Sequence, residues 1–250
     1  ANLPGFNKNF LVTGKHSGLG WYRISDAPAG AVCKFDQVEG DPYCQYGLEA
    51  SNKAMLQAAV DLGITYLAAN RGWHSHEARC DTCLIEHPLE PRVKLIPRWP
   101  TNVFYNVTDP IENTSEFNFL YGPNGIVRDG NGNAFFNVDQ TWEQILEFEA
   151  NIAMRHILTG SPYPHFVHQG NLREYADGRS LLYDWTEATL KAYDKYLDLP
   201  LISQNWAQLT TTLEDRTSFY DAGVSGILYR KLGLIEVKTG PRVVPLLLEV

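Results

Sequence analysis

The sequence predicts an α/β protein, either a barrel or an open sheet, with a short C-terminal β segment. Short apolar runs alternate with amphipathic stretches over most of the chain, which is the order of parallel strands joined by helices. After Gly223 the β-like runs follow one another with no amphipathic stretch between them. The 250 residues, 44% of them hydrophobic, are enough to bury a core. We therefore expect an α/β portion at 1–222 and a β segment at 223–250.

The predicted strands are short apolar runs bounded by glycine, proline or polar residues. In chain order they are 9–13, 64–68, 93–97, 164–168 and 199–203, followed by runs that begin at Val224, Leu234 and Val243. Two long stretches, 15–48 and 100–138, are rich in turn-forming residues, and we expect them to be irregular loops.

The predicted helices have apolar residues at helical spacing and recognisable end signals. In chain order they are 49–62, 141–158, 184–197 and a segment that begins at Thr211. The second is the clearest, because Thr141 and Gln144 have the spacing of a capping box ahead of an apolar stripe. Gly63 and Gly160 follow the first two helices and are typical of helix ends.

Composition excludes some classes of protein. The formal net charge of −8 argues against broad binding to nucleic-acid phosphates. No apolar run approaches the ~20 residues that a membrane helix needs. Aromatic residues make up 12% of the chain, which suits a carbohydrate-binding surface or a large aromatic core. The chain begins at Ala1 without a methionine, so we expect processing or a piece of a longer chain.

Four cysteines and two glycosylation sequons indicate an oxidising compartment. The cysteines form two local pairs, and we expect both to be disulfide-bonded: Cys33 with Cys44, and Cys80 with Cys83. The sequons begin at Asn106 and Asn113, where we expect exposed and glycosylated loops. Together these features predict a secreted or cell-surface protein.

The segment 74–87 has two interpretations. His74 and His76 would lie on one face of a strand, and the nearby residues Cys80, Cys83 and His87 would complete a zinc site. In an oxidising compartment the two thiols would instead form a disulfide and be lost as ligands. We keep His74 and His76 as candidate metal ligands, and a small metal-binding module around them as one alternative for the function.

Polar side chains end several predicted strands, which is where an α/β barrel places its active site. His168 ends the strand at 164–168 and is a candidate general acid for a leaving amine. His165 would point to the opposite face of that strand, so we expect its loss to affect stability more than turnover. Arg98 also follows a strand, where its guanidinium would pair with a carboxylate or contact a polymer.

Four segments are similar to a known family. They are LVTGKHSGL, AAVDLGITYLAANR, IPRWPTNVFYNV and GSPYPHFVHQGNLREYA. In that order they resemble the later part of extracellular polysaccharide deacetylases of the galactosaminogalactan deacetylase type, which are NodB-type carbohydrate esterases. The resemblance covers roughly residues 6–230 and implies a partial (β/α)7-type barrel.

The resemblance also implies a chemistry, the metal-assisted removal of an N-acetyl group, in which a divalent ion, often zinc, generates hydroxide. It makes His168 the late acid and places 15–18 in a substrate-facing loop. The candidate substrate-binding residues are then Lys15, His16, Ser17, Arg98, Trp99 and Asn171. The family's early metal motifs and catalytic base do not fit, since no Asp or His precedes Lys15.

We therefore expect part of a secreted, metal-dependent hydrolase that removes N-acetyl groups from amino-sugar polymers. The alternative is a non-catalytic glycan-binding or extracellular matrix protein on the same fold, whose aromatic residues stack on sugars. The divalent metal, zinc by preference, is expected in full-length family enzymes, with the alternative that this chain binds none. The expected partners are N-acetylated polysaccharide and the N-terminal part of the same protein, with no nucleic acid and no membrane span.

Overall fold

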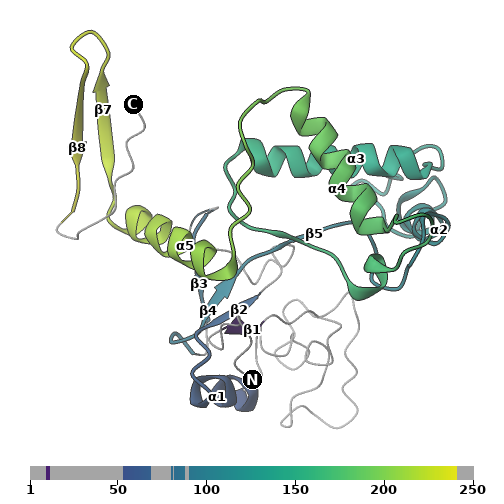
Figure 1. The fold of residues 1–250 in the computed structure, drawn as a ribbon, viewed down its shortest axis with the longest axis horizontal. Helices are drawn as coiled ribbons and strands as arrows, with labels where there is room; N and C mark the ends of the chain where they lie inside the picture. The colour runs from purple at the N-terminus through teal and green to yellow at the C-terminus, as the bar shows by residue number, and fades with distance from the viewer. Residues whose placement is uncertain (1–9, 12–52, 69–79, 81, 88–89, 241–250) are drawn as a thin grey trace. The chain divides into compact units, whose positions relative to one another are not determined.

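Residues 10–11, 53–68, 80, 82–87 and 90–240 are described by the computed structural model of the chain (Figure 1). They fall into two compact units, residues 1–98 with 203–250, and residues 99–202. The predicted boundary between 222 and 223 stays a prediction. No helix within the described ranges is long and apolar enough to cross a membrane.

The first unit contains a small mixed sheet. Its strands are β1 (Phe10–Leu11), β2 (Tyr66–Ala68), β3 (Ile85–Glu86) and β4 (Lys94–Ile96). They lie in the order β1-β2-β4-β3, with β1, β2 and β4 parallel and β3 antiparallel at one edge. The strands predicted at 9–13, 64–68 and 93–97 are therefore confirmed.

The core of this unit forms where helix α1 (Lys53–Asp61) packs on the sheet. Its members are all buried aliphatic side chains, namely Leu56, Leu67, Ile85, Val93 and Leu95. The helix predicted at 49–62 is confirmed, and Gly63 follows it with a φ of 74°, which a residue with a side chain adopts only under strain.

Helix α5 (Trp206–Asp221) belongs to the same unit but begins earlier than predicted. Asn205 and Gln208 form a capping box, in which each side chain accepts a hydrogen bond from the other residue's N–H. Thr211, the predicted start, lies inside the helix and donates its hydroxyl to the Ala207 carbonyl. The prediction was wrong because Thr211 and Glu214 have the same spacing as the true capping pair.

Two contacts hold α5 to the sheet region of this unit. The Tyr66 hydroxyl of β2 donates to Glu214, and the Leu84 N–H donates to Thr217 Oγ1 at 2.9 Å. After α5, strands β7 (Ser225–Tyr229) and β8 (Leu234–Lys238) pair antiparallel as a hairpin (Figure 1). This hairpin confirms the β runs predicted at Val224 and Leu234, while the run at Val243 lies outside the described residues.

The second unit consists mainly of helices and contains one short pair of strands. The strands are β5 (Trp99–Pro100) and β6 (His165–Phe166), which are parallel. The helices are α2 (Pro110–Tyr121), α3 (Trp142–Leu158), the 3₁₀ helix η3 (Gln169–Leu172) and α4 (Leu181–Asp194). Helices α3 and α4 pack against each other (Figure 1).

Helix α2 lies in the 100–138 stretch that the sequence predicts to be irregular, so that prediction was wrong. Asp109 caps the helix by accepting from the N–H groups of Ile111 and Glu112, and Pro110 occupies the first turn. The periodicity missed it because its apolar residues do not form a regular stripe. The fully buried Phe117 ring instead joins an aromatic cluster with Tyr121, Phe136 and Phe148.

The other helices of this unit follow the sequence more closely. The capping box of Thr141 and Gln144 starts α3 as predicted. Helix α4 begins at Leu181 under a Ser180 cap, slightly before the predicted start at Asp184. The strand predicted at 199–203 is wrong: this apolar run is irregular and exposed, with Ile202 83% accessible.

The chain is thus a mixed α/β protein, as predicted. Among the described residues the strands form three separate sheets rather than one closed barrel.

Candidate active site

The segments that follow β5 and β6 meet at one end of this strand pair. Because the strands are parallel, their carboxyl ends lie on the same side. The Thr101 hydroxyl, directly after β5, donates to the Phe166 carbonyl of β6 at 3.1 Å. We call residues 101–108 the β5 loop and residues 167–172 the β6 turn.

His168 lies in the β6 turn beside aromatic rings from both segments. Its imidazole lies edge-on to the Tyr105 ring, with centroids 6.1 Å apart, and 5.6 Å from the Phe166 ring. Tyr105 is 51% exposed and His168 is half-buried. An imidazole can gain or lose a proton near neutral pH. The catalytic role of His168 stays a prediction.

Asn171 joins the β6 turn to the β5 loop. Its Oδ1 accepts from the His168 N–H at 2.8 Å, and its Nδ2 donates to the carbonyls of Phe104 and Val107 at 2.7 and 3.1 Å. The side chain is 0% exposed. The predicted contact between Asn171 and substrate is therefore wrong. Its amide is fully buried and binds three main-chain groups instead.

Asn113 holds the same loop from helix α2. Its Oδ1 accepts from the Phe104 N–H at 3.1 Å, and its Nδ2 donates to the Asn102 carbonyl at 3.2 Å. Asn113 is fully buried, so the expectation of an exposed, glycosylated loop at this sequon was wrong. Asn106 is exposed within the β5 loop and donates to Glu116 at 2.7 Å. Its glycosylation stays a prediction.

Glu149, from α3, holds the start of the β5 loop. Its carboxylate accepts from the Asn102 N–H at 3.1 Å, from Asn102 Nδ2 at 2.6 Å and from Trp185 Nε1 at 3.2 Å. Burial raises the pKa of Glu149, and the hydrogen bonds from Asn102 and Trp185 act in the opposite direction. Three buried side chains from three different elements therefore fix this loop.

A row of aromatic rings in contact is formed by side chains of β5, α3, β6 and α4. Trp99 stacks on His156 of α3 at 3.8 Å between centroids, and its Nε1 donates to Ser161 Oγ at 3.0 Å. His156 Nδ1 and His165 Nε2 are 2.9 Å apart, and the His165 ring lies 5.1 Å from Trp185. His165 thus has different neighbours from His168. The substrate contact predicted for Trp99 stays a prediction.

The two stacked histidines resist protonation. Burial lowers the pKa of His165 to about 4, and the nearby His156 contributes to the shift. Burial also lowers the pKa of His156, helped by the charge of Arg155. At neutral pH the hydrogen bond between them therefore joins two neutral imidazoles, one as donor and one as acceptor.

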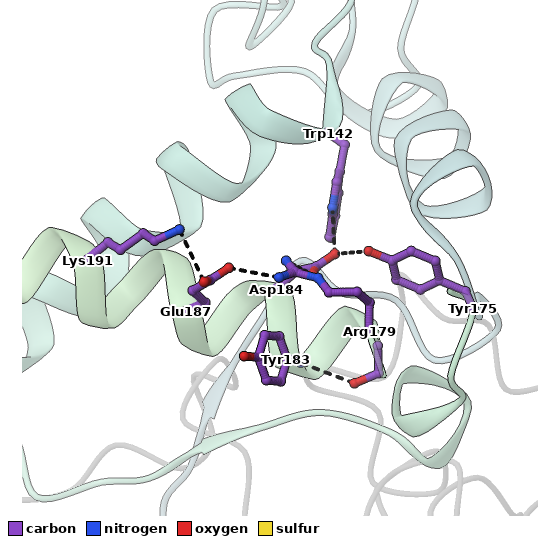
Figure 2. A network of polar contacts seen from close by, with 8 residues as sticks. Trp142, Tyr175, Arg179, Tyr183, Asp184, Glu187 and Lys191 are labelled. Atoms are coloured by element: carbon purple, nitrogen blue, oxygen red, sulfur yellow. Dashed lines mark hydrogen bonds and ion pairs between the residues drawn. The ribbon is translucent and has the colours of Figure 1, made fainter. Parts of the chain in front are cut away.

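A second buried cluster centres on Asp184 of α4 (Figure 2). Its carboxylate accepts from Trp142 Nε1 at 3.0 Å, from the Tyr175 hydroxyl and from the Arg179 guanidinium. Arg179 also donates to Glu187 at 3.0 Å. The cluster joins the start of α3, the turn before α4 and α4 itself.

This cluster adjoins the apolar support of the β5 loop. Buried Val103 and Val107 of the loop pack with Leu181, the first residue of α4. Partly buried aromatic side chains surround them, including Trp142 and Tyr175 of the Asp184 cluster. The same side chains therefore line both the polar cluster and the apolar base of the loop.

Sequence reasoning missed the supporting polar residues, although a signal was present. Asn113 lies four residues before the buried Phe117, Glu149 four after Ile145, and Asp184 three after Leu181. A polar residue in phase with the apolar face of a helix faces the core, where it needs hydrogen-bond partners.

The remaining predicted site residues lie elsewhere. Outside the described residues fall the following: Lys15, His16, Ser17, Cys33, Cys44, His74 and His76. Arg98 is 7% exposed and follows β4, and its substrate contact stays a prediction. The bond between Cys80 and Cys83 is present as predicted, so in this structure the two sulfurs are not available as thiolate ligands. In the described part of the chain no three His, Cys, Asp or Glu residues are grouped to hold a metal ion.

The arrangement of the β5 loop and β6 turn lies inside a region that matches a known family. The model of the Agd3 deacetylase domain matches residues 85–223, more than half of the chain. The chain belongs to the Agd3 deacetylase domain family. The family resemblance is therefore confirmed, and the matched region contains two of the four segments, IPRWPTNVFYNV and GSPYPHFVHQGNLREYA.

The fold agrees with this family. The chain is similar to the crystal structure of Agd3, a novel carbohydrate deacetylase, with a TM-score of 0.55 and 20% sequence identity. The match covers 70% of this chain and 27% of the Agd3 chain, so this chain spans about a quarter of that protein. No curated protein matches it.

Proposed function

We propose that this chain forms part of a carbohydrate N-deacetylase that acts on N-acetylated amino-sugar polymers, with His168 as the general acid. Membership of the Agd3 deacetylase domain family supports the reaction class. The observation that carries the assignment of His168 is its place in the β6 turn, half-buried beside the exposed Tyr105 ring. Hydrolysis adds water to the amide, releases acetate and requires a proton for the departing amine, which His168 would supply.

A divalent ion such as zinc would supply hydroxide and stabilise the oxyanion when bound. The described residues do not fit such an ion, since no three His, Cys, Asp or Glu side chains among them are grouped to hold it. Metal dependence of the full-length enzyme remains part of the proposal, with His74 and His76 as the candidate ligands. We further propose that the protein is secreted, is glycosylated at Asn106 and forms a partial (β/α)7-type barrel.

The test is acetate release from N-acetylated polysaccharide by the full-length protein that carries this chain. We expect His168→Ala to lower kcat by about 10²- to 10⁴-fold, because the proton transfer occurs in the transition state, with a much smaller change in KM. His165→Ala is the matched control. His165 packs against His156 and Trp185, so its loss should lower stability more than turnover.

Normal turnover by His168→Ala together with loss in a folded His165→Ala would transfer the role to the other histidine. A protein that binds the polymer tightly and releases no acetate would instead be the glycan-binding alternative.

A further inference from the structure

We propose that Asn171 is a positioning residue, which fixes the His168 imidazole relative to the β5 loop and its Tyr105 ring. This inference rests on the function proposed above. Asn171 contacts the main chain of His168. It accepts from the His168 N–H, so it sets the main-chain position from which the imidazole projects.

The amide of Asn171 matches the groups around it. One acceptor and two donors are needed, for the His168 N–H and for the carbonyls of Phe104 and Val107. Asparagine is the shortest side chain that carries an acceptor together with two donors. With the residue fully buried, water cannot replace these bonds without opening the contact. One side chain thereby ties two main-chain segments that are more than sixty residues apart in sequence.

Gly170 allows this close approach. A Cβ at this position would lie 3.1 Å from the Val107 carbonyl oxygen and 3.4 Å from that of Tyr105. The loop and the turn therefore meet main chain to main chain beside the Asn171 amide. A side chain at residue 170 would separate them by a few tenths of an ångström and displace Tyr105 relative to His168.

Asn113 offers a matched comparison within the same loop. It is also a fully buried asparagine with hydrogen bonds to the main chain of the β5 loop. Its amide binds Phe104 and Asn102, and neither lies in the β6 turn. Loss of Asn113 should loosen the loop alone, whereas loss of Asn171 should loosen the loop and the His168 main chain together.

The experiment compares Asn171→Ala and Asn113→Ala in the full-length protein, each alone and combined with His168→Ala. Hydrogen exchange of peptides covering 101–108 and 166–172 measures whether the Asn171 hydrogen bonds hold the loop and the turn, and it does not depend on activity. We expect Asn171→Ala to speed exchange in both peptides and to lower kcat about 10- to 100-fold, with KM changed less than about threefold. Combined with His168→Ala, it should cost less than about a further twofold, because the two residues act as a unit.

The control should behave differently. Asn113→Ala should speed exchange in 101–108 alone, and its fold-loss in kcat should persist when His168 is absent. An undiminished loss from Asn171→Ala in the His168→Ala background would overturn the positioning role, as would unchanged exchange at 166–172. Should Asn171→Ala fail to fold, Gly170→Ala leaves the Asn171 amide in place and should lower kcat several-fold, again only while His168 is present.

Failure of the proposed function gives a separate result. A wild-type protein that releases no acetate, with His168→Ala equally inactive, overturns the deacetylase assignment and with it the role of Asn171 in that reaction. The exchange data then decide the remaining structural claim, that Asn171 holds the β6 turn on the β5 loop.

Discussion

Asn171 and Asp184 are both buried in the same unit, and each side chain collects three hydrogen bonds, yet their partners differ in kind. Asn171 binds main-chain groups of the β5 loop and the β6 turn. Asp184 binds the side chains of Trp142, Tyr175 and Arg179. Side-chain partners can be changed together with the central residue, whereas main-chain partners cannot. Asn171 therefore helps to fix the conformation of a loop, whereas Asp184 fixes how helices and turns pack.

The largest expected effect on stability comes from the charged cluster. We expect Asp184→Ala to lower the free energy of unfolding by about 3–4 kcal/mol, since it removes a buried acceptor from three partly buried donors. Chemical denaturation monitored by circular dichroism measures the change. Asp194→Ala is the control: it is exposed in the same helix, and its effect should lie within about 0.5 kcal/mol.

Repair of this cluster would sharpen the comparison. Asp184→Ala combined with Tyr175→Phe removes the hydroxyl that lost its acceptor, and we expect it to recover part of the lost stability. Strictly additive losses in the double variant would show that Tyr175 and Asp184 are not coupled, contrary to their hydrogen bond.

The pair formed by His156 and His165 should make the stability of the protein depend on pH. The folded pKa of His165, about 4, lies below its ordinary value of 6.5, so between these values the unfolded chain binds a proton that the folded chain does not. Stability should therefore fall by about 2–3 kcal/mol as the pH drops from about 7 to 4. His165→Gln should remove most of this slope. An unchanged slope in that variant would assign the acid sensitivity to other groups.

Loss of the Asn171 hydrogen bonds should lower stability less than loss of Asp184, but a second substitution should restore less of it. We expect Asn171→Ala to lower the free energy of unfolding by about 2 kcal/mol, because two carbonyls and one N–H lose a buried partner. Asn171→Asp should recover little, since a carboxylate accepts from the His168 N–H but cannot donate to Phe104 or Val107. Full recovery by Asn171→Asp would mean that the two donated hydrogen bonds contribute nothing.

The smallest effect is expected at the rim of the Asp184 cluster. Glu187 pairs with Arg179 at 3.0 Å and with Lys191 at 3.2 Å in a partly exposed setting (Figure 2). We expect Glu187→Gln to change the melting temperature by less than about 2 °C, because exposed ion pairs are screened by water and salt. A loss comparable with that of Asp184→Ala would show that the rim, rather than the buried carboxylate, holds the cluster.

Local patterns in the sequence predicted the features that depend on neighbouring residues. Such features include the capping box at Thr141 and the bond between Cys80 and Cys83, which join residues three positions apart. The helix end at Gly63 depends on the conformation of that one residue. The family resemblance singled out His168 because that segment carries a continuous motif, and its catalytic role stays a prediction. The alternation of side chains along a strand predicted different surroundings for His165 and His168, and the two rings do have different neighbours.

Features that depend on distant contacts left no such pattern. Asn171 and Phe104 are 67 positions apart, so their hydrogen bond leaves no periodic signal. The Asn113 sequon specifies only three local residues and says nothing of the loop that covers it. The apolar run at 199–203 has strand-like composition, yet no described strand pairs with it and it stays exposed. Tertiary structure overrides local preference at each of these positions.

The way the β5 loop is held separates its shape from the side chains it displays. The hydrogen bonds from Asn113 and Asn171 end on peptide groups, and Glu149 binds only Asn102 within the loop. The exposed side chains of Tyr105 and Asn106 therefore project from a backbone whose path is set by buried side chains of other elements. A loop held in this way can present different side chains on the same backbone, which is how a fixed scaffold acquires new recognition.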